Sequence, residues 1–196
     1  MGASVRFPIE NSDRKIEVFT TRVDTLFGVT FLTLAPEHEW VAEITSDAQR
    51  DAVAAYVAQT AQRSERDRMS DVSRISGVFT GAYAIHPITN EKVPIWIGDY
   101  VLAGYGTGAV MAVPCGDQRD FDFATHFKLP IKNIFKDVDV SQAAFSNKEK
   151  TMIANSDFLD GLSYVDATQK IIEHLGATGI GSPQYRCLLK TASRKR

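Results

Sequence analysis

Residues 78–113 are the part of this sequence that most restricts how the chain can fold. Two runs within them, VFTGAYAIHP and VPIWIGDYVL, are rich in β-branched and aromatic residues, and the turn-forming segment ITNE lies between them. Runs of this composition on either side of a turn are typical of paired β-strands. The glycine-rich segment GYGTGAVMAVP follows and leads into a further short apolar strand. Strands are therefore expected to dominate the middle of the chain.

The N-terminal part adds further strands and a helix. Residues 3–10 and 15–21 alternate in the manner of strands, with NSD as the turn between them, and residues 28–34 form another β-rich run. Residues 46–63 have helical spacing, and Ser46 or Asp47 is expected to cap this helix. The polar segment 62–73 is expected to be a solvated helix end or a surface loop.

The C-terminal part is expected to be mainly helical. A helix is expected from Asp117 to about residue 128, followed by a strand near residues 131–135. Ser163 with Asp166 three residues later is typical of a capping box, and Gly176 stands where a glycine would end the last helix. Taken together, the pattern predicts an α+β fold built on a β-barrel or a strongly bent sheet, with flanking helices.

The composition is that of an ordinary globular chain. With 196 residues, 44% of them hydrophobic and 23% charged, one domain over residues 1–196 is expected. The formal net charge is −2, so any contact with a nucleic acid must come from a local basic patch. No apolar run reaches membrane-spanning length and no signal peptide is visible, so we expect a cytoplasmic chain with no membrane partner.

Neither a metal nor a cofactor is indicated by the sequence. The only cysteines, Cys115 and Cys187, lie far apart, and two cysteines cannot build a zinc site with four thiolate ligands or a disulfide framework. GYGTG superficially resembles a phosphate-binding loop, but no Lys-Ser/Thr pair follows it, and a strand comes next. The histidines are scattered, and surface or hydrogen-bonded core positions explain them: His38, His86, His126 and His174.

Two polar segments beside apolar strands are candidates for a functional site. The first is TTRVDT, at residues 20–25, whose threonine hydroxyls could simply cap the next turn. The second is MAVPCGDQRD, at residues 111–120. Asp117 is a natural N-cap. Asp120 lies in the first turn of the helix, where its carboxylate could stabilise the helix N-terminus or could pair with a substrate ammonium. The residue types alone leave both alternatives open.

Together these segments resemble a known family. TTRVDT, followed by GTGAVMAVP and DQRDFDFA, looks like the editing domain of bacterial leucyl-tRNA synthetase, the insertion called connective polypeptide 1. GASVRF resembles the strand that leads into this insertion, and residues 185–186 and 193–196 resemble the strand that leads out of it. The chain departs from the family at Val23, where proline is common, and at Gly116, where histidine is usual. HIGH and KMSKS signatures are absent from the sequence, so the resemblance implies an editing domain without the amino-acid-activating domain.

The resemblance implies a fold centred on a β-barrel and a post-transfer editing reaction. The reaction is hydrolysis of the ester that joins a wrong amino acid (isoleucine, norvaline or methionine) to the 3′ end of leucine tRNA, while leucyl-tRNA is spared. A synthetase pocket separates side chains that differ by one methylene by only ~1–3 kcal/mol, so a second, hydrolytic site is required. The implied partners are the tRNA 3′ end and the remainder of the synthetase, and the isolated domain is expected to be monomeric.

The resemblance also implies roles for individual residues. Asp120 matches the aspartate that holds the substrate α-ammonium, and Thr25 matches the threonine that excludes leucine. Thr20 and Thr21 are expected to hydrogen-bond the catalytic water or the oxyanion. The other implied contacts involve the nucleotide, the acyl side chain and the helix start: Arg22 with phosphate or ribose, Tyr105 with the adenosine, Met111 and Val113 with the acyl side chain, and Asp117 with Arg119 or the helix start.

Two alternatives remain. The first is an editing domain of valyl or isoleucyl specificity, which the DQRD form argues against. The second is a non-catalytic module that binds the tRNA acceptor end. Retention of the family's site residues argues against such a module, whereas Gly116 leaves room for it. The retained residues are Thr21, Arg22, Thr25 and Asp120.

Overall fold

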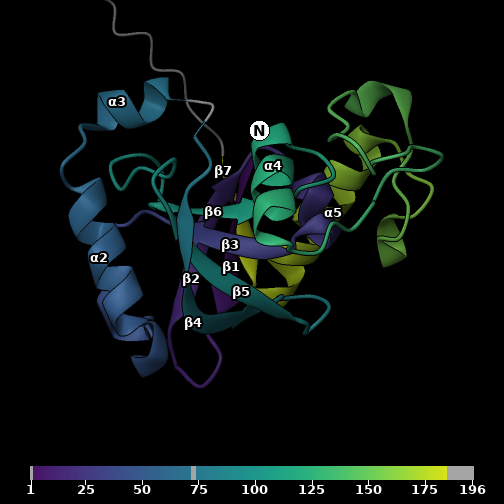
Figure 1. Cartoon of the computed structure of the whole chain (residues 1–196). Helices are drawn as coiled ribbons and strands as arrows, with labels where there is room; N and C mark the ends of the chain where they lie inside the picture. Colours follow the sequence, from purple (N-terminus) through teal and green to yellow (C-terminus); the bar gives the residue numbers. More distant parts are fainter. Residues whose placement is uncertain (1, 72–73, 185–196) are drawn as a thin grey trace, which may run out of the picture.

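The computed structural model describes residues 2–71 and 74–184 (Figure 1). Residues 185–186 and 193–196, which resemble the outgoing strand of the insertion, lie outside the described residues. The strands are β1 (Gly2–Pro8), β2 (Lys15–Thr20), β3 (Phe31–Leu34), β4 (Gly77–Ile85), β5 (Lys92–Gly98), β6 (Ala109–Ala112) and β7 (Gly181–Gln184). The α-helices are α1 (Val41–Ile44), α2 (Arg50–Thr60), α3 (Glu65–Ser70), α4 (Gln118–Phe127) and α5 (Tyr164–Thr178). The 3-10 helices are η1 (Val23–Gly28), η2 (Asp47–Gln49), η3 (Lys148–Lys150) and η4 (Asp157–Leu159).

The strands form two sheets. β1 lies between β2 and β7 in a three-stranded antiparallel sheet. The second sheet has the order β4-β5-β3-β6, in which β3 and β5 are parallel and the other neighbours are antiparallel. The sheets meet where Ile9 bridges to Ala84 and where β2 lies beside β6. The predicted α+β class is confirmed. Strand pairing within residues 2–71 and 74–184 describes two sheets and not one closed ring, so the barrel stays a prediction.

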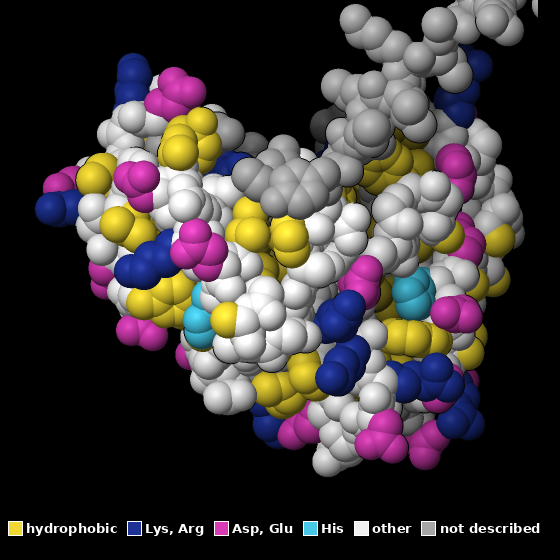
Figure 2. All heavy atoms as spheres, turned by 180° about the vertical axis from the view of Figure 1, so that it is seen from behind, with side chains coloured by type: hydrophobic (Ala, Val, Ile, Leu, Met, Phe, Trp, Pro, Cys, Tyr) yellow, Lys and Arg dark blue, Asp and Glu magenta, His cyan; other side chains and the backbone are white. Residues whose placement is uncertain are grey.

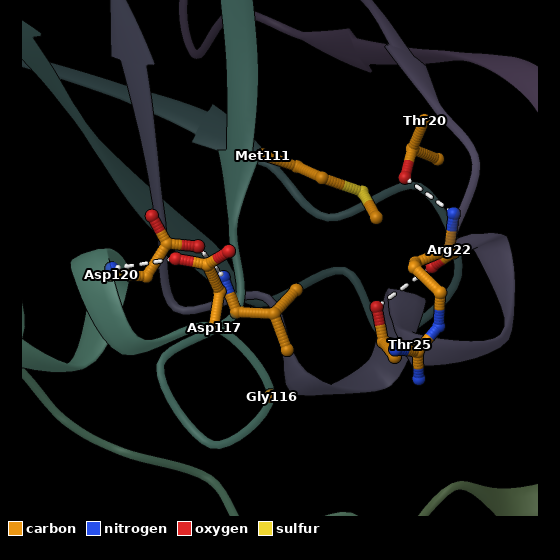
Figure 3. A pocket seen from close by; sticks show the side chains of 8 residues that line it. Thr20, Arg22, Thr25, Met111, Gly116, Asp117 and Asp120 are labelled. Atoms are coloured by element: carbon orange, nitrogen blue, oxygen red, sulfur yellow. Dashed lines mark hydrogen bonds between the residues drawn. The ribbon is translucent and has the colours of Figure 1, made fainter. Parts of the chain in front are cut away.

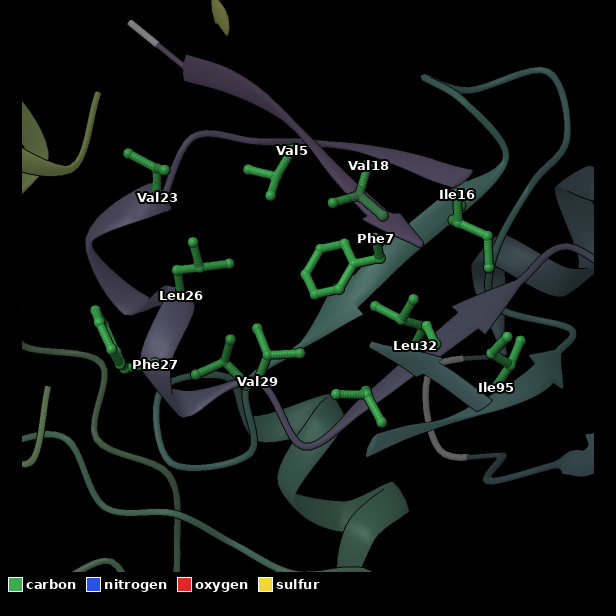
Figure 4. Packing of buried hydrophobic residues seen from close by; sticks show 14 of the residues in the cluster. Val5, Phe7, Ile16, Val18, Val23, Leu26, Phe27, Val29, Leu32 and Ile95 are labelled. Carbon is green, nitrogen blue, oxygen red and sulfur yellow. The ribbon is translucent and has the colours of Figure 1, made fainter. Parts of the chain in front are cut away.

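A hydrophobic core shared by both sheets fixes the segment that follows β2. Val23 and Leu26 of η1 are fully buried in it, and every residue of η1 is buried. Each fully buried side chain of this size contributes about 1.5–3 kcal/mol relative to an exposed one. The same packing that joins the sheets therefore holds η1. Figure 4 shows side chains of this cluster from β1, β2, β3, β5 and the η1 segment: Val5, Phe7, Ile16, Val18, Val23, Leu26, Phe27, Val29, Leu32 and Ile95.

Helices cover the sheets on several sides (Figure 1). α4 packs on the second sheet through Phe123, whose ring stacks on Phe31 of β3 with ring centroids 5.0 Å apart. α5 lies against β7 and η1, and α2 lies against β4. None of the helices in the described part of the chain is long and apolar enough to span a membrane.

The predicted end of the last helix is wrong by three residues. Ser163 caps α5 as predicted, because its Oγ accepts a hydrogen bond from the backbone N–H of Asp166. The helix, however, continues through Gly176 and ends at Gly179, which adopts a left-handed conformation with φ of 71°. Both glycines satisfy the sequence pattern of a C-terminal cap, but only Gly179 adopts the backbone conformation that glycine favours.

The segment from residue 46 to residue 73 also differs from expectation. Neither Ser46 nor Asp47 caps the helix through its side chain; the Asp47 carboxylate instead pairs with Arg50, and a 3-10 turn precedes α2. Within the polar stretch, α3 is a separate short helix capped by Ser64. It buries Arg68, so this stretch is not simply solvated.

The predicted strand near residues 131–135 is wrong as well. The structure has only an isolated bridge between Phe135 and Ile153 there.

Candidate functional site

A cavity of about 230 Å³ lies between the two polar segments (Figure 3). β2 lies beside β6, so the turn after β2 faces the end of β6 and the start of α4. Residues that are about 90 positions apart in the sequence are thereby brought together. The cavity is lined from one side by Thr20, Arg22 and Thr25, and from the other by Met111, Val113, Gly116, Asp117 and Asp120.

The threonine hydroxyls on the first side hold the turn between β2 and η1. Thr20 Oγ1 accepts a hydrogen bond of 2.9 Å from the backbone N–H of Arg22. Thr25 Oγ1 donates a hydrogen bond of 2.7 Å to the backbone carbonyl of Arg22. The turn-capping alternative is therefore correct for the structure. The two hydroxyls are left with different capacities, because Thr20 keeps its proton to donate, whereas Thr25 has used its own.

Asp24 holds the guanidinium of Arg22. Nε and Nη2 of Arg22 donate to the two carboxylate oxygens at 3.0 and 2.9 Å, and the Asp24 side chain is 1% exposed. A two-pronged pair of this kind fixes the plane of the guanidinium as well as its position. Asp24 was not among the residues predicted for the site. The sequence feature that could have indicated Asp24 is its position two residues after Arg22, for which a phosphate or ribose contact was expected.

Asp120 is the buried acid of the cavity. Its side chain is turned toward the end of β6, where one carboxylate oxygen accepts a hydrogen bond of 2.8 Å from the backbone N–H of Val113. Burial, followed by the nearby negative charge of Asp117, raises the pKa of Asp120 to about 7, although the Val113 hydrogen bond and Arg119 oppose the shift. A cation brought into the cavity would favour the ionised form of this carboxyl group.

The raised pKa of Asp120 predicts a pH-dependent stability. In the folded protein Asp120 keeps its proton up to a pH of about 7, whereas the ordinary value is 3.8. Between these values the folded state binds more protons, so the free energy of unfolding falls as the pH rises, by up to about 4 kcal/mol. Urea unfolding at pH 5 and pH 8 measures this. Asp120→Asn, which keeps an oxygen for Val113, should lack this component, and an identical pH dependence in both proteins would contradict the assignment.

Asp117 is the N-cap of α4, as predicted. Its carboxylate accepts hydrogen bonds from the backbone N–H groups of Arg119 and Asp120, at 2.9 and 3.1 Å. The guanidinium of Arg119 lies over the ring of Tyr100, 5.5 Å from its centroid. Asp117 thus contacts Arg119 through the backbone.

A second, larger cavity of about 500 Å³ adjoins the first and shares Thr20, Met111, Asp117 and Asp120 with it. Of these two cavities, the larger one alone is lined by Thr21, Tyr105 and Arg119. Tyr105 is 73% exposed at its edge.

Tyr100 also lines the larger cavity, although it was not predicted for the site. It donates a hydrogen bond to Thr33, and burial raises the pKa of its hydroxyl. It was missed because it lies within the run VPIWIGDYVL, whose composition is typical of a core strand.

Cys115 precedes the cavity-lining Gly116 and is buried. Burial raises the pKa of its thiol to about 11. Because the thiolate is the nucleophilic form, this thiol is not suited to attack an ester at neutral pH.

Removal of metal ions is expected to leave unchanged the ester hydrolysis that the family resemblance implies. Within the described ranges, no three His, Cys, Asp or Glu side chains are grouped so that they could hold a metal ion. The expected result is an equal rate of aminoacyl ester hydrolysis before and after dialysis against a chelator. Loss of hydrolysis that added zinc restores would contradict this prediction.

Comparison with known proteins identifies the family. The family model described as "Leucyl-tRNA synthetase, editing domain" matches residues 1–176. The chain is similar to the leucine–tRNA ligase of Christiangramia forsetii (63% identical, covering 100% of this chain and 21% of the relative) and to that of Amoebophilus asiaticus (48% identical, 100% and 22%). It therefore spans about a fifth of the length of these curated relatives.

A solved structure is also similar. It is the crystal structure of a ternary complex of LeuRS, tRNA and LeuAMS from Agrobacterium radiobacter, with a TM-score of 0.71 and 35% identity over 92% of this chain and 19% of that chain. The family model, the relatives and this structure agree with the resemblance carried by TTRVDT and DQRD. The chain belongs to the family of leucyl-tRNA synthetase editing domains.

Proposed function

We propose that this chain hydrolyses the ester of leucine tRNA that carries a wrong amino acid, with isoleucine, norvaline and methionine as the acyl groups. The observation that carries this proposal is the buried carboxyl group of Asp120 at the wall of a small cavity. An aminoacyl ester presents an α-ammonium beside the scissile bond. Pairing with that ammonium compensates the cost of ionising Asp120 in a buried place and fixes the ester for attack by water.

The threonine side of the cavity supplies polar groups for the reaction. Thr20 accepts its hydrogen bond from Arg22 and so retains a proton that it can donate to the attacking water or to the developing oxyanion. An aminoacyl ester is already activated, so positioned water and such a donor suffice. Met111 and Val113 line the same cavity and provide apolar contact for the acyl side chain. Thr25 provides the bulk that excludes leucine.

The larger cavity is proposed to hold the terminal adenosine. It adjoins the small cavity, as a nucleoside adjoins its acyl group. Tyr105 offers an aromatic face for stacking on the base. Arg119 of this cavity, and Arg22 of the adjoining small cavity, which Asp24 holds, offer positive charge to the ribose or phosphate. Such a contact positions the RNA without reading its sequence. Thr21 is proposed to contact the nucleotide or a water molecule from this side.

The partners are proposed to be the 3′ end of leucine tRNA and the remainder of the synthetase. Figure 2 shows Lys and Arg side chains interspersed with Asp and Glu on the face opposite to that of Figure 1. With a formal net charge of −2, such a surface gives little long-range attraction for RNA, so the rest of the synthetase supplies much of the affinity. We further propose that residues 1–196 act as one cytoplasmic, monomeric domain and that the two sheets form a barrel.

The second candidate function, a non-catalytic module for the acceptor end, is favoured by the position of Gly116. This residue lines the cavity without a side chain. The test is incubation of the chain with leucine tRNA charged with isoleucine, norvaline, methionine or leucine, with binding and ester hydrolysis measured separately. Binding without hydrolysis of any of the four esters would favour the module.

A further inference from the structure

His86 is a buried histidine that the proposed reaction does not use. It follows β4 directly, at the start of the turn that leads to β5, and is 1% exposed. Its ring lies edge-on to Phe7, with ring centroids 5.9 Å apart, and is tilted against Phe27 at 6.2 Å. A polar ring in such surroundings needs hydrogen-bond partners for both nitrogens.

The hydrogen bonds of His86 define its protonation. Nδ1 faces the backbone N–H groups of Ile88 and Thr89, each at 3.2 Å, so it must accept. The proton of the neutral ring is therefore on Nε2, which donates to the backbone carbonyl of Leu26 at 2.9 Å. Burial lowers the pKa of His86, which keeps the ring in this neutral form.

The two nitrogens thus serve different parts of the fold. Nδ1 organises the turn of the β4–β5 hairpin, whereas Nε2 reaches a residue 60 positions earlier in the chain. Leu26 follows Thr25 directly within η1. Thr25 is therefore held on both sides along the chain. Its hydroxyl and its backbone N–H donate to the carbonyl of Arg22, and the carbonyl of Leu26, the next residue, accepts from His86 Nε2.

We propose that His86 is a positioning residue for amino-acid selectivity: its Nε2–H ties η1 to the β4–β5 hairpin and thereby sets how far Thr25 reaches into the small cavity. This inference rests on the proposed function. A shift of η1 by a fraction of an ångström changes the contact between Thr25 and a branched acyl group, whereas the ammonium site at Asp120 belongs to a different segment.

Two variants separate the two nitrogens. His86→Asn places an amide near the position of Nδ1, which keeps an acceptor for the turn but does not reach Leu26. His86→Gln extends an amide donor to the position of Nε2. The matched control is Thr80→Val, which removes another buried hydrogen bond of β4, from Thr80 Oγ1 to the Ile95 carbonyl at 2.6 Å. Thermal unfolding first establishes a temperature at which each variant is folded.

The readout is the ratio of isoleucyl-tRNA to leucyl-tRNA hydrolysis, which a merely structural loss does not change. The ratio is expected to fall by roughly 10-fold in His86→Asn. It is expected to stay within about 3-fold of wild type in His86→Gln and in Thr80→Val. An unchanged ratio in folded His86→Asn, or an equal fall in Thr80→Val, would overturn the proposal. If His86→Asn does not fold, His86→Gln decides, because a roughly 10-fold fall there contradicts the positioning role and a wild-type ratio supports it.

Failure of this inference is distinguishable from failure of the proposed function. If wild type hydrolyses neither ester, the proposed function fails and the positioning role fails with it. If wild type discriminates and Asp120→Asn is inactive while His86→Asn keeps the wild-type ratio, only the role of His86 fails.

Discussion

Asp120→Asn is expected to lower hydrolysis of isoleucyl-tRNA by about 10²–10³-fold while the protein stays folded, the usual effect of removing one preorganised electrostatic group. The amide keeps an oxygen for the N–H of Val113 but cannot carry the charge that holds an ammonium. Asparagine is preferable to alanine, because alanine would leave that buried N–H without its partner at a cost of about 1–3 kcal/mol. Single-turnover hydrolysis at pH 8 measures the effect.

Asp122→Asn is the matched control for this prediction. Asp122 lies two residues further along α4, is exposed, and lines neither of the two cavities of the site. The Asp122→Asn protein should hydrolyse isoleucyl-tRNA at the wild-type rate. Near-wild-type hydrolysis by a folded Asp120→Asn protein would reject the ammonium-binding role of Asp120.

Thr25→Ala is expected to let the domain hydrolyse correctly charged leucyl-tRNA. Removal of the methyl and hydroxyl groups makes room for the γ-branch of leucine, and the selectivity for isoleucine over leucine should fall by roughly 10–200-fold. Thr25 is 3% exposed and donates to the Arg22 carbonyl, so its loss should also cost about 1–2 kcal/mol of stability. Parallel hydrolysis of both esters, with urea unfolding of each variant, measures the two effects separately.

Two further variants of Thr25, with a control at Thr30, separate the effect of side-chain volume from that of hydrogen bonding. Thr25→Ser keeps the hydroxyl for Arg22 and removes only the methyl group, so it should admit leucine with a smaller loss of stability. Thr25→Tyr should fill the cavity and block the mischarged esters as well. Thr30→Ala removes another buried threonine, which lines neither cavity, and should leave selectivity unchanged. An unaltered selectivity ratio in Thr25→Ala would leave Thr25 as part of the scaffold.

Local sequence patterns predicted the local structure well where one residue decides the outcome. Asp117 and Ser163 cap helices because a short polar side chain directly before an amphipathic segment has few better partners than the free N–H groups. The choice between Gly176 and Gly179 was not predictable, since a glycine at either position fits the sequence pattern of a helix end. Asp47 does not cap α2, because it lies in the 3-10 turn that precedes the helix, and its carboxylate pairs with Arg50.

The contents of the site were predictable, but its geometry was not. The motif resemblance placed Thr20, Thr25 and Asp120 in one site, and the structure brings these side chains to one cavity. Their separation along the chain is bridged by the packing of β2 beside β6, which no local pattern encodes. For the same reason the burial of Asp120, and the link from His86 to Leu26, emerge only from the tertiary structure.

The proposed selective hydrolysis of mischarged leucine tRNA can be tested on the wild-type chain itself. The decisive measurement compares the hydrolysis of isoleucyl-tRNA with that of leucyl-tRNA, both prepared on leucine tRNA. Spontaneous hydrolysis of each ester is subtracted, and Asp120→Asn serves as the inactive reference. We expect isoleucyl-tRNA to be hydrolysed at least about 10-fold faster than leucyl-tRNA. Hydrolysis of both esters at the spontaneous rate, or at equal enzymatic rates, would contradict it.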